Sequence, residues 1–470
     1  MSSATPGLPA AAVRVLIDSL SAEGLDPHAL AIARGGTILA EHSWAPWSAD
    51  RPALSYSASK TFTSLAIGLL RSEGLLSLDD SAGALLGLPD PHGITVRHLL
   101  TMNTGHSQAQ ADTFDFDVRT LLSTPPAAAP GTSFAYNSDA TYALSCIVTA
   151  VTGQRLTDYL RPRLLDPLGI GRRWMKPAFG IEQGASGFHL TVHDLARIGM
   201  LLADGGRFGG AQVVPADYVD ELARPWSDTR DPSQPADPEN DWTYGYGYQV
   251  WRGRHGFRVD GAYGQFAVVL PEHGLVIAYQ GATLETQRTM RAFWRFVEAV
   301  EVADAAEDDA PDAAPAAGAP SSLDAWDARA ALAPAPDGQP DATGTEVVAA
   351  PHGWTVTLPP AITGGAAQTV PVGDSGWTRT VLDLPVPAES REPVVVGPPV
   401  DDGTHVAVAA RGAADAEGTL IHVVVPTSPH RLIVRRAADG TVTAAWHTVP
   451  LRGGAFATLA VPAWLAHDAG

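Results

Sequence analysis

Apolar positions near the start of the chain change from a helical to a strand-like spacing. Over residues 9–22 they recur every three or four residues, which predicts an amphipathic helix. Residues 28–33 and 37–44 are β-like runs on either side of Gly35-Gly36, a pair of residues typical of a hairpin turn. The pattern therefore predicts a helix followed by a β-hairpin.

The middle of the chain is helical in pattern, and strand patterns return after it. The segment from Ser57 to about residue 73 predicts a helix, and residues 75–205 predict mainly helices and loops. Strand-like runs return at 246–251, 257–261 and 265–279, and a helix is expected at 287–303. We therefore expect an α/β (α+β) fold, in which an antiparallel sheet carries an inserted all-α lobe. A ligand site is expected in the cleft between the two.

The composition changes after Glu301. Residues 301–312 include six acidic side chains, and Ala, Pro and Asp dominate to about residue 336, which is typical of a linker. β-like runs follow, and Asp439-Gly440 is a hairpin signal between two of them. The sequence predicts three parts: a domain over residues 1–300, an acidic Ala/Pro-rich linker over 301–343 and a β-rich C-terminal domain over 344–470.

Composition and charge exclude several classes of partner. The chain has 470 residues, of which 45% are apolar and 17% charged, and its formal net charge is −20. Such a charge repels nucleic acid and anionic membrane surfaces, so neither is an expected partner. The first residues lack the pattern of a signal peptide, and no apolar run approaches the roughly 20 residues that span a bilayer. We therefore expect a cytoplasmic protein.

Ser57 and Lys60 are one helical turn apart at the start of the predicted helix. A serine hydroxyl needs a nearby base to act as a nucleophile, and a lysine serves when burial lowers its pKa. Only two of the 31 basic residues are lysines, and arginine, which fills the other positions, does not release its proton near neutral pH. A capping serine beside a surface lysine has the same spacing, so spacing alone leaves both interpretations open.

Four stretches carry a more specific signal: Ser57-Ala58-Ser59-Lys60, His98-Leu99-Leu100-Thr101-Met102-Asn103-Thr104-Gly105, Phe134-Ala135-Tyr136-Asn137-Ser138, and Gly184-Ala185-Ser186-Gly187 with the residues that follow to Gly199. Together they resemble the β-lactamase-related serine hydrolases. This family includes class C β-lactamases, penicillin-binding proteins such as D-alanyl-D-alanine carboxypeptidases, family VIII esterases and 6-aminohexanoate-dimer hydrolases. The resemblance covers roughly residues 8–300.

The resemblance implies a β-lactamase/transpeptidase-like fold and a division of labour among three residues. Ser57 would be acylated, while Lys60 and Tyr136 transfer the protons. A phenol beside an ammonium group is expected to have a lowered pKa, which would suit Tyr136 to act as a base.

The sequence departs from the family pattern at two positions. Ser138 stands where many relatives have an asparagine, and its hydroxyl offers a single donor to a substrate carbonyl. The third family motif, which carries a cation, is not recognisable, and its nearest candidate is Val259-Asp260-Gly261-Ala262. In this alignment, the N–H groups of Ala262 and Ser57 would form the oxyanion hole. Asp260 would repel a substrate carboxylate, which favours esters or amides without one.

The sequence therefore predicts a serine hydrolase that cleaves a small ester or amide through an acyl-enzyme on Ser57. Two alternatives stay open: a β-lactamase or D,D-peptidase acting on penicillin-like or D-alanyl substrates, and a non-catalytic binding protein on the same fold. No cofactor is expected. His189 and His193 have a metal-ligand spacing, but Thr191 and Asp194 predict a capping box that starts a helix between them. No metal site is therefore expected.

An aromatic cluster remains unassigned: Trp242, Tyr244, Tyr246 and Tyr248. These side chains are expected either to line the cleft or to belong to the core.

Overall fold

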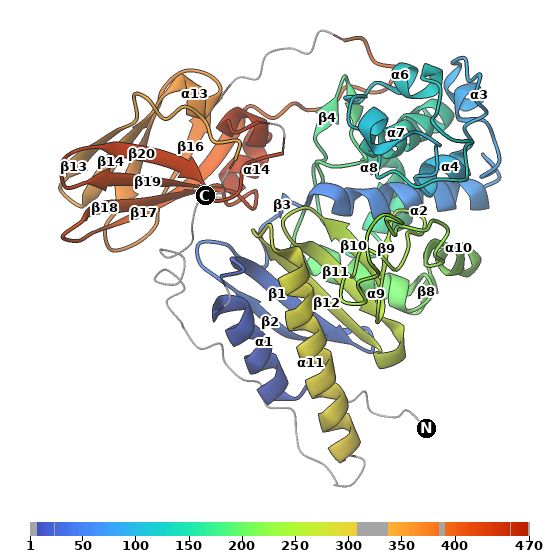
Figure 1. Ribbon diagram of the computed structural model, residues 1–470, viewed down its shortest axis with the longest axis horizontal. Helices are drawn as coiled ribbons and strands as arrows, with labels where there is room; N and C mark the ends of the chain where they lie inside the picture. The colour runs from blue at the N-terminus through green and yellow to red at the C-terminus, as the bar shows by residue number, and fades with distance from the viewer. Residues whose placement is uncertain (1–6, 23, 308–336, 385–390, 452, 469–470) are drawn as a thin grey trace.

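The computed structural model describes residues 7–22, 24–307, 337–384, 391–451 and 453–468. Two large sheets dominate these residues (Figure 1). One is six-stranded, with strand order β2-β1-β12-β11-β10-β9, and the other is eight-stranded and belongs to the C-terminal part of the chain. None of the helices in the described ranges is long and apolar enough to cross a membrane.

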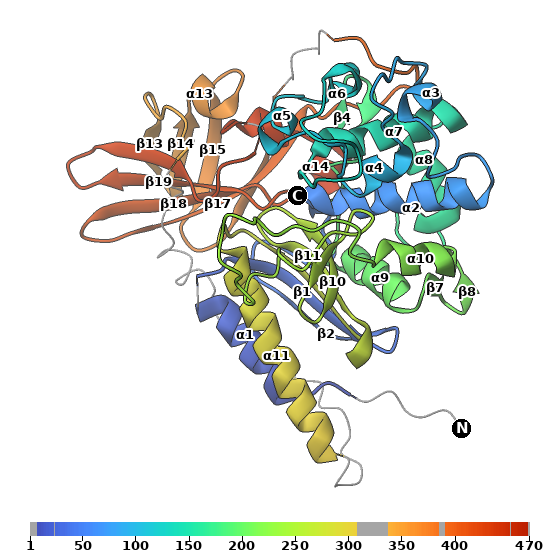
Figure 2. The same ribbon diagram turned by 45° about the vertical axis from the view of Figure 1, so that its right-hand side comes forward.

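The six-stranded sheet unites the start of the chain with residues near 250–281. Its strands are β1 (Pro27–Arg34), β2 (Thr37–Ser43), β9 (Trp251–Gly253), β10 (Gly256–Gly261), β11 (Gln265–Leu270) and β12 (Leu275–Gly281). All neighbouring strands are antiparallel, and every residue of β1, β11 and β12 is buried. Both faces are therefore covered. Helices α1 (Ala10–Ala22) and α11 (Thr286–Glu307) pack together on one face, and α9 (Val192–Ala203) lies on the other (Figure 2).

The helical lobe is inserted between β2 and β9. Its helices are α2 (Ser59–Ser72), α3 (Ala82–Leu86), α4 (Val96–Leu100), α5 (Gln108–Ala111), α6 (Val118–Ser123), α7 (Ser138–Thr152) and α8 (Leu156–Leu160), and α10 (Ala216–Leu222) follows α9. Four short strands pair within the same region: β4 (Pro177–Ala178) with β5 (Ile181–Glu182), and β7 (Arg207–Phe208) with β8 (Ala211–Gln212). Helix α2 is buried from its first residue to Leu70, because it lies between the lobe and the sheet (Figure 1).

The eight-stranded sheet is antiparallel except for one parallel pairing between β15 and β17. Its strands are β13 (Glu346–Ala350), β14 (Gly353–Leu358), β15 (Gln368–Gly373), β16 (Thr378–Asp383), β17 (His405–Ala414), β18 (Gly418–Val424), β19 (Arg431–Ala437) and β20 (Val442–Trp446). Helices α13 (Pro360–Thr363) and α14 (Ala463–Asp468) accompany it. The predicted sheet, inserted all-α lobe and β-rich C-terminal part are confirmed.

One detail of the sequence prediction is wrong. The run 246–251 was expected to be a strand, but Gln249 has φ of 63° and breaks it, and β9 begins only at Trp251. The buried Gln249 side chain instead donates to the carbonyls of Leu99 and Leu100, which ties this turn to α4. The expected linker over 301–343 is described only in part, and its bounds stay a prediction. Helix α11 continues to Glu307, residues 308–336 lie outside the described part, and Gln339 already bonds to Trp446.

The C-terminal sheet packs against the strand that leads to Ser57. The Leu54 N–H donates to the Thr427 carbonyl at 2.9 Å. Arg431 forms an ion pair of 3.1 Å with Asp26, and both side chains are fully buried. No pattern in the sequence predicts this contact surface between the regions 1–300 and 344–470.

Candidate active site

Ser57 lies in a tight turn at the entrance to α2. The short strand β3 (Ala53–Leu54) pairs with β6 (His189–Leu190), and the turn Tyr56–Ala58 follows directly. Tyr56 has φ of 46°, a left-handed conformation that a bulky side chain rarely adopts. Ser57 is half-buried at this turn, one helical turn before Lys60.

Lys60 is almost completely buried, with 1% of its surface exposed, and its amine is fully engaged. Nζ donates to Ser57 Oγ at 3.2 Å, to Ser138 Oγ at 3.1 Å and to the Ala185 carbonyl at 2.7 Å. Burial lowers the pKa of Lys60 to about 7, although the carboxylates of Asp139 and Asp260 act in the opposite direction. Lys60 therefore meets the two conditions for a base: contact with the Ser57 hydroxyl and a proton that is released near neutral pH.

Tyr136 lies on the other side of Ser57. The Ser57 side chain is near enough to lower the pKa of its phenol slightly, and the amine of Lys60 is 5.0 Å from the centre of its ring. Burial raises the pKa of Tyr136 well above its usual value, and the charge of Asp260 adds to this effect. The lowered pKa expected from the sequence is therefore wrong, because desolvation outweighs the neighbouring amine and Lys60 is itself not a permanent cation. A protonated phenol in this place is suited to donate a proton.

Two residues that the sequence analysis missed hold Tyr136. The side chain of Gln108 accepts from the Tyr136 N–H and donates to its carbonyl, both at 3.0 Å. The Trp251 ring is stacked on the Tyr136 ring with centroids 5.7 Å apart. Neither residue belongs to a recognisable sequence motif. Gln108 is the first residue of the short helix α5, and Trp251 is the first residue of β9.

Ser138 is the first residue of α7 and reaches the site. Asn137 caps this helix, with its side-chain oxygen accepting from the N–H groups of Asp139 and Ala140. The cap places the Ser138 hydroxyl at hydrogen-bonding distance from Lys60 Nζ. The structure thus brings Ser138 together with Ser57, Lys60 and Tyr136.

Gly261 ends strand β10 beside the turn that carries Ser57, and Ala262 follows it. A Cβ on Gly261 would lie 2.2 Å from the Ser55 carbonyl oxygen and 3.2 Å from the Ala58 nitrogen. Only glycine therefore lets β10 approach the turn this closely. This approach brings Ala262 to the neighbourhood of Ser57, where the sequence predicts the oxyanion hole.

Asp260 lies in the site but not as an isolated acid. Its carboxylate accepts from Arg258 Nε at 2.7 Å, and the Arg258 side chain is 2% exposed and covers the ring of Trp242 at 4.4 Å. Burial is the main cause that raises the pKa of Asp260, and Arg258 opposes it. The expected repulsion of a substrate carboxylate is consequently weaker than an unpaired Asp260 would give.

The remaining candidates have structural roles. His189 is buried in β6, whereas His193 lies in α9 and contacts Glu41 at 2.7 Å. The predicted capping box of Thr191 and Asp194 is confirmed and starts α9 between the two histidines. Within the described ranges, no group of three or more His, Cys, Asp or Glu side chains could hold a metal ion.

The aromatic cluster is divided among the site, the core and the surface. Tyr246 packs edge-on against Tyr136, with centroids 6.1 Å apart. Tyr248 is stacked on Trp226 outside the site, and Tyr244 is exposed at the surface.

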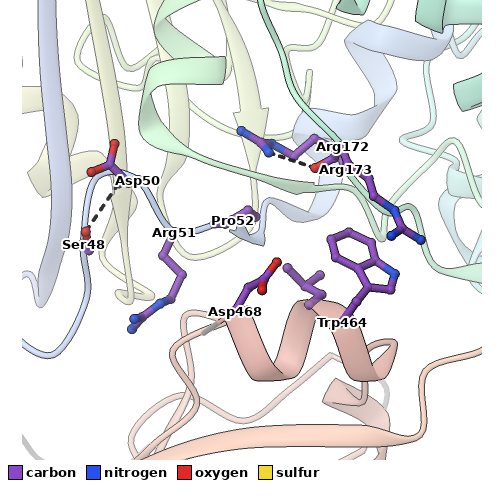
Figure 3. Close-up of a pocket in the computed structure, with 9 residues that line it drawn as sticks. Ser48, Asp50, Arg51, Pro52, Arg172, Arg173, Trp464 and Asp468 are labelled. Atoms are coloured by element: carbon purple, nitrogen blue, oxygen red, sulfur yellow. Dashed lines mark hydrogen bonds between the residues drawn. The ribbon is translucent and has the colours of Figure 1, made fainter. Parts of the chain in front are cut away.

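A cavity of about 460 Å³ lies elsewhere, between the segment before β3 and helix α14 (Figure 3). Its lining includes Arg51, Pro52, Arg172, Trp464 and Asp468. None of the predicted site residues lines it. Its lining comes from both the N-terminal and the C-terminal regions, so the cavity lies at the boundary between them.

Comparisons with known proteins agree with the fold. The sequence model of the family described as Beta-lactamase matches residues 16–300. The 6-aminohexanoate-dimer hydrolase of Paenarthrobacter ureafaciens is 27% identical over 227 residues, which cover 41% of this chain and 56% of that protein. The match thus spans little more than half of that relative.

Solved structures share the same fold at low sequence identity. A Bacillus anthracis protein provisionally described as a 6-aminohexanoate-dimer hydrolase aligns with a TM-score of 0.50 and 20% identity, over 60% of this chain and 81% of its own. A protein of Bacteroides dorei DSM 17855, provisionally described as a beta-lactamase, aligns with a TM-score of 0.52 and 17% identity, over 62% of this chain and 98% of its own.

Proposed function

The chain belongs to the beta-lactamase family, and from this premise we propose that it is a serine hydrolase that cleaves small esters or amides through an acyl-enzyme on Ser57. The observation that carries the proposal is the hydrogen bond of 3.2 Å from Lys60 Nζ to Ser57 Oγ. It matters because burial lowers the pKa of this lysine to about 7, so that the amine is able to take the proton of Ser57.

In the acylation step, Ser57 Oγ attacks the substrate carbonyl carbon while its proton passes to Lys60 Nζ. The electron pair of the C=O bond moves to the carbonyl oxygen, which the N–H groups of Ser57 and Ala262 would stabilise. When the tetrahedral intermediate collapses, the bond to the leaving group breaks. The leaving alkoxide or amine receives the phenolic proton of Tyr136, and Lys60 returns a proton to Tyr136.

In the deacylation step, a water molecule attacks the acyl carbonyl and gives its proton to the same pair of residues. The bond to Ser57 Oγ breaks, and Oγ regains a proton from Lys60. A high pKa for Tyr136 suits this sequence, since the phenol holds its proton until a basic leaving group takes it. No step requires a metal or an organic cofactor.

The Asp260–Arg258 pair supports a preference for neutral substrates. The carboxylate lies close enough to Lys60 and Tyr136 to affect the pKa of both. Its partner Arg258 is held behind it by the carbonyl of Asp241 at 3.0 Å and by the ring of Trp242. A substrate would therefore meet the carboxylate before the guanidinium, which favours esters and amides without an acidic group.

The experiment that tests the proposal is a turnover panel with wild type and Ser57→Ala. Neutral p-nitrophenyl esters of two to eight carbons, a neutral anilide, a chromogenic cephalosporin and a D-alanyl-D-alanine peptide cover the three enzymatic alternatives. We expect the wild type to hydrolyse the neutral esters or the anilide fastest, and Ser57→Ala to hydrolyse none. Fastest turnover of the cephalosporin or the peptide would instead assign a β-lactamase or D,D-peptidase, and no turnover would favour a binding protein.

A further inference from the structure

The two residues expected to form the oxyanion hole are each joined to a tyrosine. Tyr56 precedes Ser57, and Tyr263 follows Ala262. Both tyrosines have left-handed backbones, with φ of 46° and 66°. Side chains of this size avoid that conformation unless the surrounding structure fixes it. Both N–H donors of the proposed oxyanion hole therefore lie next to a residue with a strained backbone. Contacts with the surrounding structure have to stabilise these two conformations.

The C-terminal domain supplies contacts to both tyrosines. Their side chains belong to the same apolar cluster as the core of the eight-stranded sheet, and their rings are 5.3 Å apart. The Tyr263 hydroxyl donates to the Val449 carbonyl at 2.5 Å. The Tyr56 hydroxyl is 2.5 Å from Nε2 of His430, which immediately precedes β19.

The direction of the Tyr56–His430 bond follows from the other side of the imidazole. His430 Nδ1 is 2.8 Å from the Thr448 carbonyl, which only accepts, so the ring proton is on Nδ1. Nε2 is then an acceptor, and Tyr56 donates to it. Burial lowers the pKa of His430 to about 3, so the ring stays neutral over the pH range in which an esterase is assayed.

We propose that the C-terminal domain sets the geometry of the oxyanion hole, and that His430 is the positioning residue that does so. The peptide bond between Tyr56 and Ser57 carries the N–H that faces the developing oxyanion. Its orientation depends on the backbone angles of Tyr56, and the bond from Tyr56 to His430 fixes the far end of that side chain. This inference rests on the proposed function, because an oxyanion hole has a role only in acyl transfer.

The experiment compares variants at buried contacts between the two domains. Tyr56→Phe removes the hydroxyl that bonds to His430. Trp47→Phe is the matched control, since it removes an indole N–H that donates to the Ser428 carbonyl at 3.2 Å, in the same interface. His430→Leu abolishes the acceptor, and His430→Gln keeps an acceptor at a similar reach. The readouts are kcat and KM for p-nitrophenyl butyrate, together with the thermal midpoint.

We expect Tyr56→Phe and His430→Leu to lower kcat about tenfold with KM changed less than about twofold. This is smaller than the loss of about 10²–10³ when a whole oxyanion donor is deleted, because the donor is displaced and not removed. His430→Gln should recover most of kcat. Trp47→Phe should lower the thermal midpoint as much as Tyr56→Phe and leave kcat within about twofold.

Equal kcat values for Trp47→Phe and Tyr56→Phe would overturn the proposal, and so would an unchanged kcat in His430→Leu. If His430→Leu does not fold, Tyr56→Phe against Trp47→Phe decides alone. The failure of the proposed function has a different signature. In that case the wild type itself neither hydrolyses the ester nor reacts with a fluorophosphonate.

Discussion

Gly261 lies against Ser55 so closely that a Cβ on Gly261 would be 2.2 Å from the Ser55 carbonyl oxygen. This contact holds the end of β10, with Ala262, beside the turn that carries Ser57. The distance between the two N–H donors of the proposed oxyanion hole thus depends on the absence of a single side chain.

Gly261→Ala is expected to reduce kcat/KM by about tenfold or more, because β10 has to move away from the nucleophile turn and takes Ala262 with it. Steady-state hydrolysis of a neutral ester measures the loss. Gly376→Ala is the control, since a Cβ on Gly376 meets no atom within 4 Å. Equal activities of the two variants would show that the spacing of β10 and the turn does not matter.

The buried amine of Lys60 predicts a pH dependence. Burial lowers its pKa to about 7, and the neutral amine is the base, so kcat/KM should rise through about pH 7 and fall about tenfold per unit below it. Lys60→Arg keeps the charge but does not release a proton, so it should lose about 10²–10⁴ in kcat, as Lys60→Ala does. Near-wild-type kcat for Lys60→Arg would show that only the positive charge is needed.

The carboxylate of Asp260 predicts the response to substrate charge. Wild type should prefer a neutral ester to its carboxylate-bearing analogue by no more than about tenfold, since Arg258 offsets part of the repulsion. Asp260→Asn leaves Arg258 without its counter-charge, so the preference should vanish or reverse. Ratios of kcat/KM for the two esters, in both proteins, measure the effect. A wild type that already prefers the acidic ester would contradict this account of β10.

The contact surface between the domains predicts how the chain behaves after cleavage. A protease that cuts between residues 308 and 336 should leave two fragments that stay associated, because the buried Arg431–Asp26 pair and the Tyr56–His430 bond join them. Native size-exclusion chromatography of the cut protein should show one peak. In Arg431→Met, which removes the buried guanidinium that pairs with Asp26 at a cost of about 3–5 kcal/mol, the fragments should separate. Separation of the wild-type fragments would mean that the interface is weak.

Much of the fold and the centre of the site follow from the sequence. The hairpin of β1 and β2, the long helix at α2 and the late strands are visible in local spacing, since apolar periodicity reports which face of an element is buried. Ser57, Lys60 and Tyr136 are marked by motifs. Ser57 and Lys60 are expected to be neighbours because they are one helical turn apart. In the structure, Lys60 Nζ is 3.2 Å from Ser57 Oγ.

Other features depend on contacts between distant segments, which a single sequence does not encode locally. The position of Arg258, which pairs with Asp260, depends on its bond to the carbonyl of Asp241, 17 residues earlier in the chain. The pKa of Tyr136 was expected in the wrong direction, because its burial comes from the packing of Trp251 and Tyr246. Nothing near His430 in the sequence relates it to Tyr56, because the two residues are 374 positions apart.

The central claim is that Ser57 is a nucleophile activated by Lys60, and the intact mass of the protein after exposure to a fluorophosphonate tests it most directly. The account predicts a single covalent adduct on wild type, located on the peptide that contains Ser57, and an adduct rate that rises with pH through about 7. Ser57→Ala, with an unchanged thermal midpoint, should remain unmodified. An unmodified wild type, or an equal adduct on Ser57→Ala, would contradict the account.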